Sequence, residues 1–433
     1  IWHSDALDLK PETSHLKPFL TNMHVVIISD HESRGGAAIA AGRLATGLIA
    51  ANHRVTRLCA YPDGQPHPWA SQTLVAPHFP LRRVIRRGLP LSARTILDDL
   101  AVAPANDALR RALDHLRPDV VHLHNLHGGI GAGWSPRLLS VAAEMAPVVW
   151  TLHDMWPITG RCVYSYGCER FIQGCDATCP TPHEYPSLPP SRIAAAWNLR
   201  RQIIAATPQL VGVAPSRWMQ GRALAGIWAG HRVERIANGL DLNTYQPTNR
   251  DAARRALDLP TVGTLIMVAM PHLADPRKGA DLLKALTSAP GPRPLHLVTM
   301  GAGQLPATGT GIEILPLGYV ANETRRALAY SAADLLLHAA PEDNLPLTVI
   351  EAMACGTPTV ALPVGGLSDL VRPGVTGWLA NGRGPQHLAV ALTTALSDLS
   401  TGQNLRESCR AIAESEYGLD RFVEQHCGVY RGI

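Results

Sequence analysis

Charged residues are scarce in this chain, and their balance excludes some classes of partner. Asp, Glu, Lys and Arg together make up 17% of the 433 residues, and the formal net charge is only +4. So small a net charge gives no electrostatic reason to expect a nucleic acid as partner. The hydrophobic fraction of 46% is typical of a globular chain and excludes general disorder.

Long apolar runs and a secretory leader are also missing. No run approaches the ~20 apolar residues that a membrane-spanning helix needs. Residues 1–22 lack the basic and then apolar design of a secretory signal, so we expect them to form an extension before a first strand at Met23. We therefore expect a cytoplasmic protein whose cysteines are kept reduced.

Short apolar runs alternate with helical patterns from Met23 onward. The runs 24–29, 120–124, 147–153 and 264–269 have the length and composition of buried strands. Such alternation is typical of α/β proteins with parallel sheets covered on both faces. Because 433 residues exceed one ordinary core, the pattern predicts two doubly wound, Rossmann-like domains.

The alternation restarts after a polar, proline-containing connection near 245–249. We therefore expect a first domain over 23–245, a second over 246–414, and a helix over 415–433 that packs back on the first domain. Ligands of doubly wound sheets bind beyond the carboxyl ends of the strands. The cleft between the two domains is thus the expected site.

The run 343–358 carries the most information about function. Asp343 and Glu351 stand eight positions apart, with a proline turn and a predicted helix start between them. A helix N-terminus offers free backbone N–H groups and the positive end of a dipole, so a phosphate can dock there. Eight residues is slightly over two helical turns, so both carboxylates can face one ligand. An amphipathic helix with a buried face explains the same pattern without a ligand.

Two glycine-containing turns suit phosphate groups. Gly35 and Gly36 follow the first strand where a helix begins, and glycines let the backbone approach a phosphate closely. The turn does not match G-x-G-x-x-G, which argues against a nicotinamide enzyme. Arg277 and Lys278 precede Gly279 after the first strand of the second domain. Fixed cations there would stabilise a diphosphate leaving group; a solvated basic turn is the alternative.

Histidines close two predicted strands of the first domain. His153 lies in the run 151–157, at a strand end that points its imidazole into the cleft. A structural histidine held by the neighbouring Asp154 is the alternative. His124 and His127 close an adjacent strand, where they suit either contact with an acceptor or a capping role.

In this order the motifs resemble the retaining glycosyltransferases of family 4, in particular those of the exopolysaccharide or colanic-acid type. The resemblance spans nearly the whole chain and rests on the runs 153–156, 277–279 and 342–346 and on a window of four cysteines. It implies the GT-B fold of two facing Rossmann-like domains, a UDP- or GDP-linked sugar donor, retention of configuration and no required cofactor. The implied acceptor is a saccharide or lipid-linked saccharide of bacterial surface polysaccharide biosynthesis.

The resemblance also implies a role for each motif. Glu351 would bind the ribose hydroxyls, Lys278 would neutralise the leaving diphosphate and His153 would orient the sugar. The implied catalytic residues are His153, Arg277, Lys278 and Asp343; the implied donor-binding residues are Gly35, Gly36, His272, Tyr319, Asn344, Leu345, Pro346, Leu347 and Glu351; and the implied acceptor-binding residues are His124 and Asp154.

Two positions depart from the family pattern. Asp343 stands where the family has Glu, and His272 stands where it often has Arg, so Arg277 or a protonated His272 would supply the second charge. These departures motivate an alternative function, that of a catalytically weak binding or scaffold subunit of a polysaccharide assembly complex. A phosphorylase or epimerase of the same architecture is a further alternative, because fold does not determine function.

The cysteine window lies directly after the His153 motif. It holds four of the eight cysteines, namely Cys162, Cys168, Cys175 and Cys179. In a reducing compartment such clustering favours a metal over disulfides, and four thiolates suit a structural Zn²⁺. The spacing is not that of two C-x-x-C pairs, so disulfides and free thiols stay open as alternatives.

The segment 81–89 mixes four arginines with apolar residues. A basic amphipathic segment can lie on an anionic membrane surface, which suits an acceptor carried on a lipid. Peripheral contact with the inner face of the plasma membrane is the corresponding prediction, and a solvated helix face is the alternative.

Overall fold

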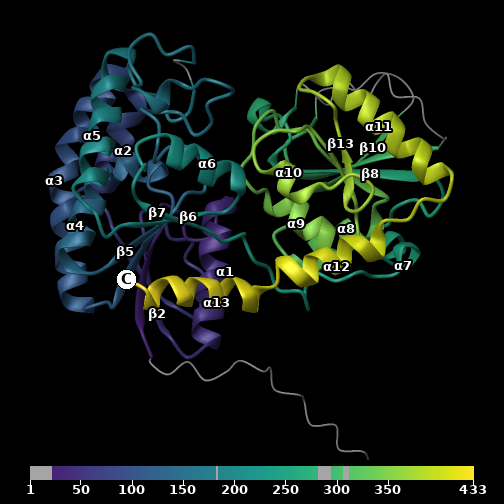
Figure 1. Ribbon diagram of the computed structural model, residues 1–433, viewed down its shortest axis with the longest axis horizontal. Helices are drawn as coiled ribbons and strands as arrows, with labels where there is room; N and C mark the ends of the chain where they lie inside the picture. Colours follow the sequence, from purple (N-terminus) through teal and green to yellow (C-terminus); the bar gives the residue numbers. More distant parts are fainter. Residues whose placement is uncertain (1–21, 182–183, 281–293, 306–311) are drawn as a thin grey trace, which may run out of the picture.

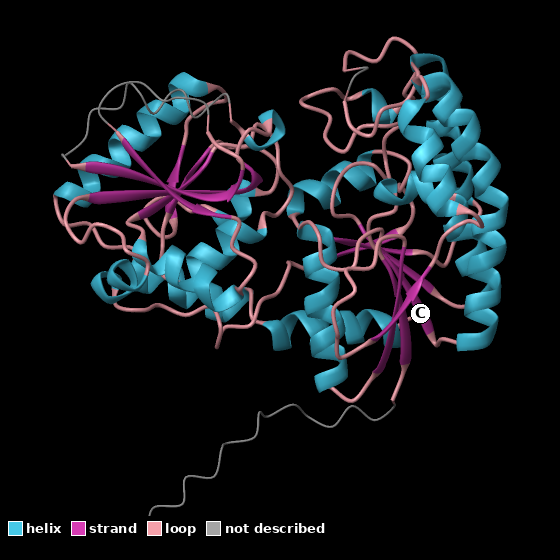
Figure 2. Ribbon diagram, turned by 180° about the vertical axis from the view of Figure 1, so that it is seen from behind, coloured by secondary structure: helices cyan, strands magenta, loops and turns pink. Residues whose placement is uncertain are grey.

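The computed structural model describes residues 22–181, 184–280, 294–305 and 312–433. Within these residues the chain forms two lobes, each built on one parallel sheet with helices on both faces (Figures 1 and 2). This is the α/β architecture of two Rossmann-like units that the sequence predicts. The predicted extension over 1–22 falls almost entirely outside the described residues.

The first lobe holds a seven-stranded sheet in the order β3-β2-β1-β4-β5-β6-β7. Its strands are β1 (His24–Ile28), β2 (Arg54–Cys59), β3 (Ala70–Thr73), β4 (Val120–Leu123), β5 (Val148–Thr151), β6 (Val211–Ala214) and β7 (Arg232–Arg235). Its helices are α1 (Gly36–Ala50), α2 (Phe79–Gly88), α3 (Leu91–Leu116), α4 (Arg137–Met145), α5 (Ile193–Ala205) and α6 (Arg217–Ala225), with short 3₁₀ turns at η1 (His127–Ala132), η2 (Arg170–Ile172) and η3 (Pro190–Arg192).

The second lobe holds a six-stranded sheet in the order β10-β9-β8-β11-β12-β13. Its strands are β8 (Thr264–His272), β9 (Leu295–Ala302), β10 (Glu313–Gly318), β11 (Leu335–His338), β12 (Thr359–Ala361) and β13 (Gly377–Leu379). The helices of this half are α7 (Arg250–Ala256), α8 (Glu323–Ala332), α9 (Leu347–Ala354), α10 (Leu367–Leu370), α11 (Pro385–Ser400), α12 (Arg406–Glu416) and α13 (Leu419–Arg431), with a 3₁₀ turn at η4 (Pro276–Lys278).

Strand β1 shows why the first sheet is buried on both faces. All five of its residues are buried, and successive side chains of a strand point to opposite faces. Val26 and Ile28 belong to the hydrophobic core on one face, whereas Val25 and Ile27 belong to the core on the other. A continuous apolar run is therefore what this position in a parallel sheet requires.

Helix α13 returns from the second lobe to the first, as Figure 1 shows in yellow. Its Phe422 and Val423 lie in the same core as Val25 and Ile27. Gly47 of α1 allows this close approach, since a Cβ there would meet Val423 Cγ2 at 2.3 Å. The C-terminal helix thus packs against α1 and ties the two lobes together.

No helix in the described ranges has both the length and the apolar content that crossing a bilayer demands. The segment predicted to be basic and amphipathic forms helix α2, with Phe79 buried and its other apolar side chains largely exposed.

Candidate functional site

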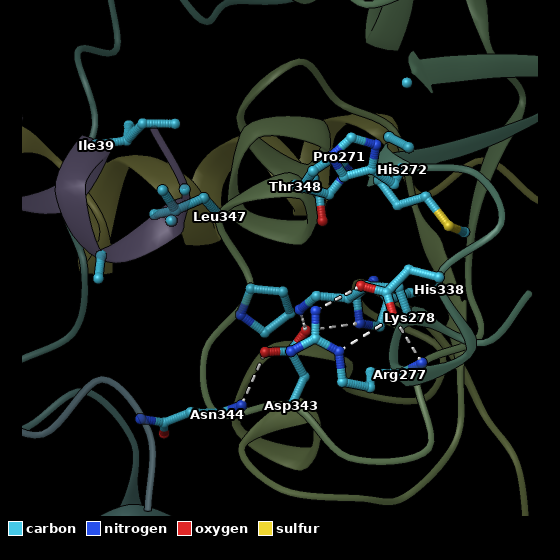
Figure 3. A pocket seen from close by; sticks show the side chains of 18 of the residues that line it. Ile39, Pro271, His272, Arg277, Lys278, His338, Asp343, Asn344, Leu347 and Thr348 are labelled. Atoms are coloured by element: carbon cyan, nitrogen blue, oxygen red, sulfur yellow. Dashed lines mark hydrogen bonds and ion pairs between the residues drawn. The ribbon is translucent and has the colours of Figure 1, made fainter. Parts of the chain in front are cut away.

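A cavity of about 800 Å³ lies between the lobes, at the carboxyl ends of the strands. All the residues that the sequence predicts for catalysis and donor binding line it. The first lobe contributes the turns after β1, β4, β5 and β6, and the second contributes those after β8, β9, β10 and β11 together with the start of α9. Figure 3 shows part of this lining.

Asp343 lies at the centre of the second lobe's contribution. Lys278 Nζ donates to Asp343 Oδ2 at 2.6 Å, Tyr164 Oη donates to Oδ1 at 3.1 Å, and His338 Nε2 lies 3.5 Å from Oδ2. Figure 3 shows Lys278 and His338 beside this carboxylate. Burial favours the neutral acid, but the Lys278 ammonium and the adjacent His338 hold the pKa of Asp343 well below its usual range. The cavity therefore presents a fixed ion pair.

Asn344 connects the two lobes through its side chain. Its Nδ2 donates to the carbonyl oxygens of Leu152 at 2.9 Å and His153 at 3.0 Å, and its Oδ1 accepts from Ser216 Oγ at 2.6 Å. Its backbone N–H already bonds Asp343 Oδ1 at 3.0 Å. Asn344 thus positions the strand end that carries His153, and the free amides for a donor phosphate begin after it.

Two glycines shape the backbone behind the ion pair. Gly365 has φ +55°, and a Cβ there would meet the Asp343 carbonyl oxygen at 1.7 Å. A Cβ on Gly366 would meet the Asn344 carbonyl oxygen at 1.8 Å. Only glycine lets this turn lie against the Asp343 backbone.

The loop that enters α9 presents backbone amides to the cavity. Pro346 caps the helix in an extended conformation, and Leu347 and Thr348 of the first turn line the cavity. The first N–H groups of a helix have no partner within the helix. This arrangement suits a phosphate, as the sequence predicts.

Glu351 is held by a cation from the other lobe. Arg43 Nη2 of α1 donates to Glu351 Oε1 at 2.6 Å, and Tyr330 Oη donates to Oε2 at 3.2 Å. The same guanidinium bonds Glu323 Oε1 at 3.0 Å. Arg43 was not predicted from the sequence; its only signal is a single cation on a helix otherwise made of small and apolar residues. Each Glu351 oxygen keeps a lone pair that a ribose hydroxyl can use.

His153 is half-buried at the first lobe's edge of the cavity, and the buried His124 lies behind it. His124 Nδ1 and His153 Nε2 are 2.7 Å apart. Burial lowers the pKa of His153 to about 4 and that of His124 well below its usual value, so both rings are neutral at physiological pH. Direct contact of His124 with an acceptor is not supported, because the side chain is 1% exposed and does not line the cavity.

Asp154 has a different partner from the one suggested by its sequence position. Its Oδ2 lies 2.9 Å from His127 Nε2, and its Oδ1 accepts from the backbone N–H of Trp156 at 2.8 Å. Burial opposes the charge on His127, but Asp154 outweighs it and raises the pKa of that histidine. Asp154 and His127 both line the cavity, which leaves His153 with His124 as its hydrogen-bond partner.

The other residues predicted to bind the sugar donor differ in how many contacts their side chains make within the protein. Arg277 Nη2 donates to Asp275 Oδ2 at 2.8 Å, so much of its charge is offset locally. His272 ends β8, is exposed and lies apart from the Asp343 cluster in Figure 3. Tyr319 is 63% exposed at the rim. Gly35 has φ +92° at the start of α1, and no atom lies within 4 Å of a Cβ placed there, so this turn is open to the cavity.

Sequence comparison assigns both lobes to one family. The family described as "Glycosyltransferase Family 4" matches residues 34–244, and "Glycosyl transferases group 1" matches residues 264–398. The chain belongs to glycosyltransferase family 4. Members of this family are retaining enzymes that use nucleotide sugars, and the two-lobed architecture of this glycosyltransferase is the GT-B fold.

Curated relatives differ in their acceptors. This glycosyltransferase is 29% identical over 330 residues to D-inositol 3-phosphate glycosyltransferase 1 of Catenulispora acidiphila, covering 72% of each chain. It is 27% identical over 265 residues to the putative colanic acid biosynthesis glycosyl transferase WcaC of Escherichia coli K12, covering 59% of this chain and 62% of that one. The colanic-acid type is therefore one distant relative among several, and the pathway stays a prediction.

Solved structures share the fold over the whole length. Sucrose-phosphate synthase of Thermosynechococcus elongatus superposes with a TM-score of 0.70 at 19% identity, covering 95% of this chain and 99% of that chain. HepE of Anabaena in complex with UDP-glucose gives a TM-score of 0.64 at 18% identity, with 95% and 100% covered. WaaG, a glycosyltransferase of lipopolysaccharide biosynthesis, gives 0.65 at 16% identity, with 94% and 100% covered.

Proposed function

We propose that this glycosyltransferase moves a sugar from a UDP- or GDP-linked donor to a saccharide or lipid-linked saccharide acceptor of bacterial surface polysaccharide biosynthesis, with retention of configuration. The observation that carries the proposal is the cavity that unites the Lys278–Asp343 pair, the start of α9 and His153. The UDP-glucose that HepE holds is of the same donor class.

The donor would lie mainly against the second lobe. Glu351 would accept hydrogen bonds from the ribose hydroxyls, and the first amides of α9 would bind the diphosphate. Lys278 would neutralise the charge that builds on the leaving phosphate. Arg277 would contribute less, because Asp275 offsets part of its positive charge. These groups supply the required positive charge, so the proposed transfer needs no divalent metal.

His153 would act as a hydrogen-bond donor to the sugar or its phosphate. Its Nε2 faces His124, so Nδ1 is the ring nitrogen left for substrate. Within the described residues His124 Nε2 has no hydrogen-bond partner. At this buried position an unpaired acceptor nitrogen costs less free energy than an unpaired N–H donor. His124 would therefore donate from Nδ1, which makes His153 Nε2 the acceptor and His153 Nδ1 the donor.

The acceptor would enter against the first lobe, beside Asp154 and His127. Its hydroxyl would attack the anomeric carbon from the face that the phosphate leaves, and that phosphate would take the proton. No side chain of the cavity is proposed as a covalent nucleophile. Asn344 and Arg43 hold the lobes together around the donor, which limits the access of water and so the hydrolysis of the donor.

Nucleotide binding tests this proposal first. We expect one of UDP, GDP, ADP or TDP to raise the unfolding midpoint with or without Mg²⁺, since a ligand at 100 times its Kd stabilises the native state by about 2.7 kcal/mol. No shift with any of them in folded protein would contradict the proposal. Binding without turnover of any nucleotide sugar would instead favour the weakly catalytic scaffold subunit.

A membrane-bound acceptor is favoured by a separate surface. Among the described residues, six of the thirteen exposed large hydrophobic side chains fall on α2 and the first half of α3: Leu81, Val84, Ile85, Leu91, Ile96 and Leu100. Arginines at 82, 83, 86, 87 and 94 lie on the same two helices, and Arg86 among them is paired with Asp98 at 2.8 Å. Exposed apolar side chains on helices rich in cations match an anionic lipid surface, so we propose peripheral contact with the inner face of the plasma membrane.

Vesicle flotation tests the membrane proposal. The Val84→Glu and Ile85→Glu double variant should lose binding to vesicles that contain phosphatidylglycerol. Val262→Glu is the matched control, because Val262 is 72% exposed in the second lobe and should leave binding unchanged. Equal binding by all three proteins would exclude this surface as the membrane contact.

A further inference from the structure

The four clustered cysteines line one small pocket away from the donor cavity. Cys162, Cys168, Cys175 and Cys179 surround a space of about 20 Å³. A cavity needs roughly 10–15 Å³ to hold one water, so this space takes a single small body such as an ion. All four cysteines are free thiols.

The segment around this pocket has little regular structure to hold it. Between β5 and α5 the structure describes only two 3₁₀ turns, η2 and η3, apart from bends and loops. Yet the segment reaches across to the second lobe, where Tyr164 Oη donates to Asp343 Oδ1 and the Tyr166 N–H bonds Glu342 Oε2. A structural metal site is one means of ordering such a segment.

Two buried guanidinium groups flank the cysteines without an acidic partner. Arg161 is 2% exposed and Arg200 is 4% exposed. Arg161 Nη2 lies 3.9 Å from Cys179 Sγ, whereas Arg200 donates to the carbonyl oxygens of Ala196 and Gly160 and covers the Trp156 ring at 4.0 Å. No carboxylate of the described residues lies within 4.0 Å of either guanidinium, and both Nε atoms lack a hydrogen-bond partner there.

Neutral thiols would leave these charges unbalanced. Arg161 Nη1 donates to the Glu184 carbonyl oxygen, and the hydrogen-bond acceptors of Arg200 among the described residues are likewise carbonyl oxygens. A buried cation without a counter-charge is costly. The one acid at the pocket, Asp176, is already paired with Arg170 at 3.0 Å.

We propose that Cys162, Cys168, Cys175 and Cys179 bind one structural Zn²⁺, with Arg161 and Arg200 as its buried counter-charges. Four thiolates around one Zn²⁺ leave two negative charges in excess, which the two guanidiniums match one for one. Disulfides would occupy the same pocket but leave both arginines without an anion. The site is closed by four protein ligands, so its role is to hold the loop that carries Tyr164 to Asp343.

Metal binding would draw the thiols together. No three of these sulfurs lie within 4.8 Å of one another among the described residues, whereas a tetrahedral site holds each sulfur about 2.3 Å from the ion. Because all four side chains line the same pocket, we expect rotation about their Cα–Cβ bonds to bring the sulfurs inward. The position of Arg161 beside Cys179 then places a donor N–H on a ligating sulfur, an arrangement that strengthens such sites.

Elemental analysis of the purified protein tests the proposal. We expect about one zinc per chain, released by a thiol-blocking reagent and replaced by Co²⁺ with the visible d–d bands of a tetrahedral thiolate site. Cys175→Ser and Cys179→Ser should lose the metal. Cys59→Ser is the matched control, because Cys59 is a buried free thiol of β2 in the same lobe, and it should keep the metal.

A second variant tests the counter-charges and does not depend on removing a ligand. Arg161→Gln should weaken zinc binding by about 10–100-fold, as loss of a group that hydrogen-bonds a metal ligand usually does. Arg161→Lys keeps the positive charge and should weaken zinc binding less. Wild-type protein that takes up neither Zn²⁺ nor Co²⁺ under reducing conditions would overturn the proposal. So would a mass spectrum of the native protein showing these cysteines as disulfides. Protein that is stabilised by a nucleotide but binds no metal would contradict the zinc site alone, and the proposed function would be unaffected.

Discussion

The Lys278–Asp343 pair makes the sharpest prediction, because it joins the two parts of the proposed donor site. Lys278→Met keeps the length of the side chain and removes its charge. Loss of one group that stabilises developing negative charge reduces kcat about 10²–10³-fold, or about 2.7–4 kcal/mol. Breaking a fully buried ion pair costs about 3–5 kcal/mol of stability. Here Lys278 is 31% exposed, and Asp343 keeps its bonds from Tyr164 and Asn344, so we expect about 1–2 kcal/mol.

The stability loss should depend on pH with a definite sign. Burial favours the neutral acid, but Lys278 and His338 depress the pKa of Asp343. A carboxyl with a depressed folded pKa stabilises the fold above its unfolded pKa and loses that contribution as pH falls through the folded pKa. Without the Lys278 ammonium, burial dominates and favours the neutral form of Asp343. The stability loss of Lys278→Met should therefore be largest at neutral pH and shrink as pH falls through the ordinary aspartate range.

A double variant separates structure from catalysis. Lys278→Met with Asp343→Asn removes both charges, so unfolding by urea should show most of the stability restored, while donor turnover stays as low as in the worse single variant. Turnover of Lys278→Met within 3-fold of wild type, on the same donor and at saturating acceptor, would refute the role given to Lys278.

Three further predictions concern contacts that cross the cavity. Arg43→Met leaves the buried Glu351 without its cation, so thermal unfolding should show a loss of about 3–5 kcal/mol that Glu351→Gln partly relieves; an unchanged midpoint would contradict it. His124→Phe should lower kcat about 10-fold, the value of one hydrogen bond, with little change in donor KM, and a pure KM effect would argue against its support of His153. The raised pKa of His127, which Asp154 causes against burial, means that this pair stabilises the fold fully below the ordinary histidine pKa and less as pH rises through the raised value. Asp154→Asn should abolish that slope in unfolding measured between acidic and alkaline pH.

Strand predictions succeeded where apolar runs are continuous and failed where a strand is short or rich in polar residues. The runs at 24–29 and 120–124 became β1 and β4, because strands buried on both faces need apolar residues throughout. Strand β3 has four exposed residues and β13 has only three residues, so neither produces an apolar run. Edge strands form by pairing with a neighbour already in place, which no local pattern records.

The sequence by itself determined the two-lobed α/β fold, because apolar runs depend on short-range order, and its resemblance to a family predicted residues that line the cavity. Apolar periodicity sets the strands, and the spacing of Asp343 and Glu351 across one helix start places both at the same cavity. The tertiary structure alone decided which charges meet. Arg43 lies 308 positions from Glu351, and Tyr164 lies 179 positions from Asp343, so only the packing of one lobe on the other sets these distances. Burial, likewise a property of the whole fold, made His153 neutral and paired Asp154 with His127.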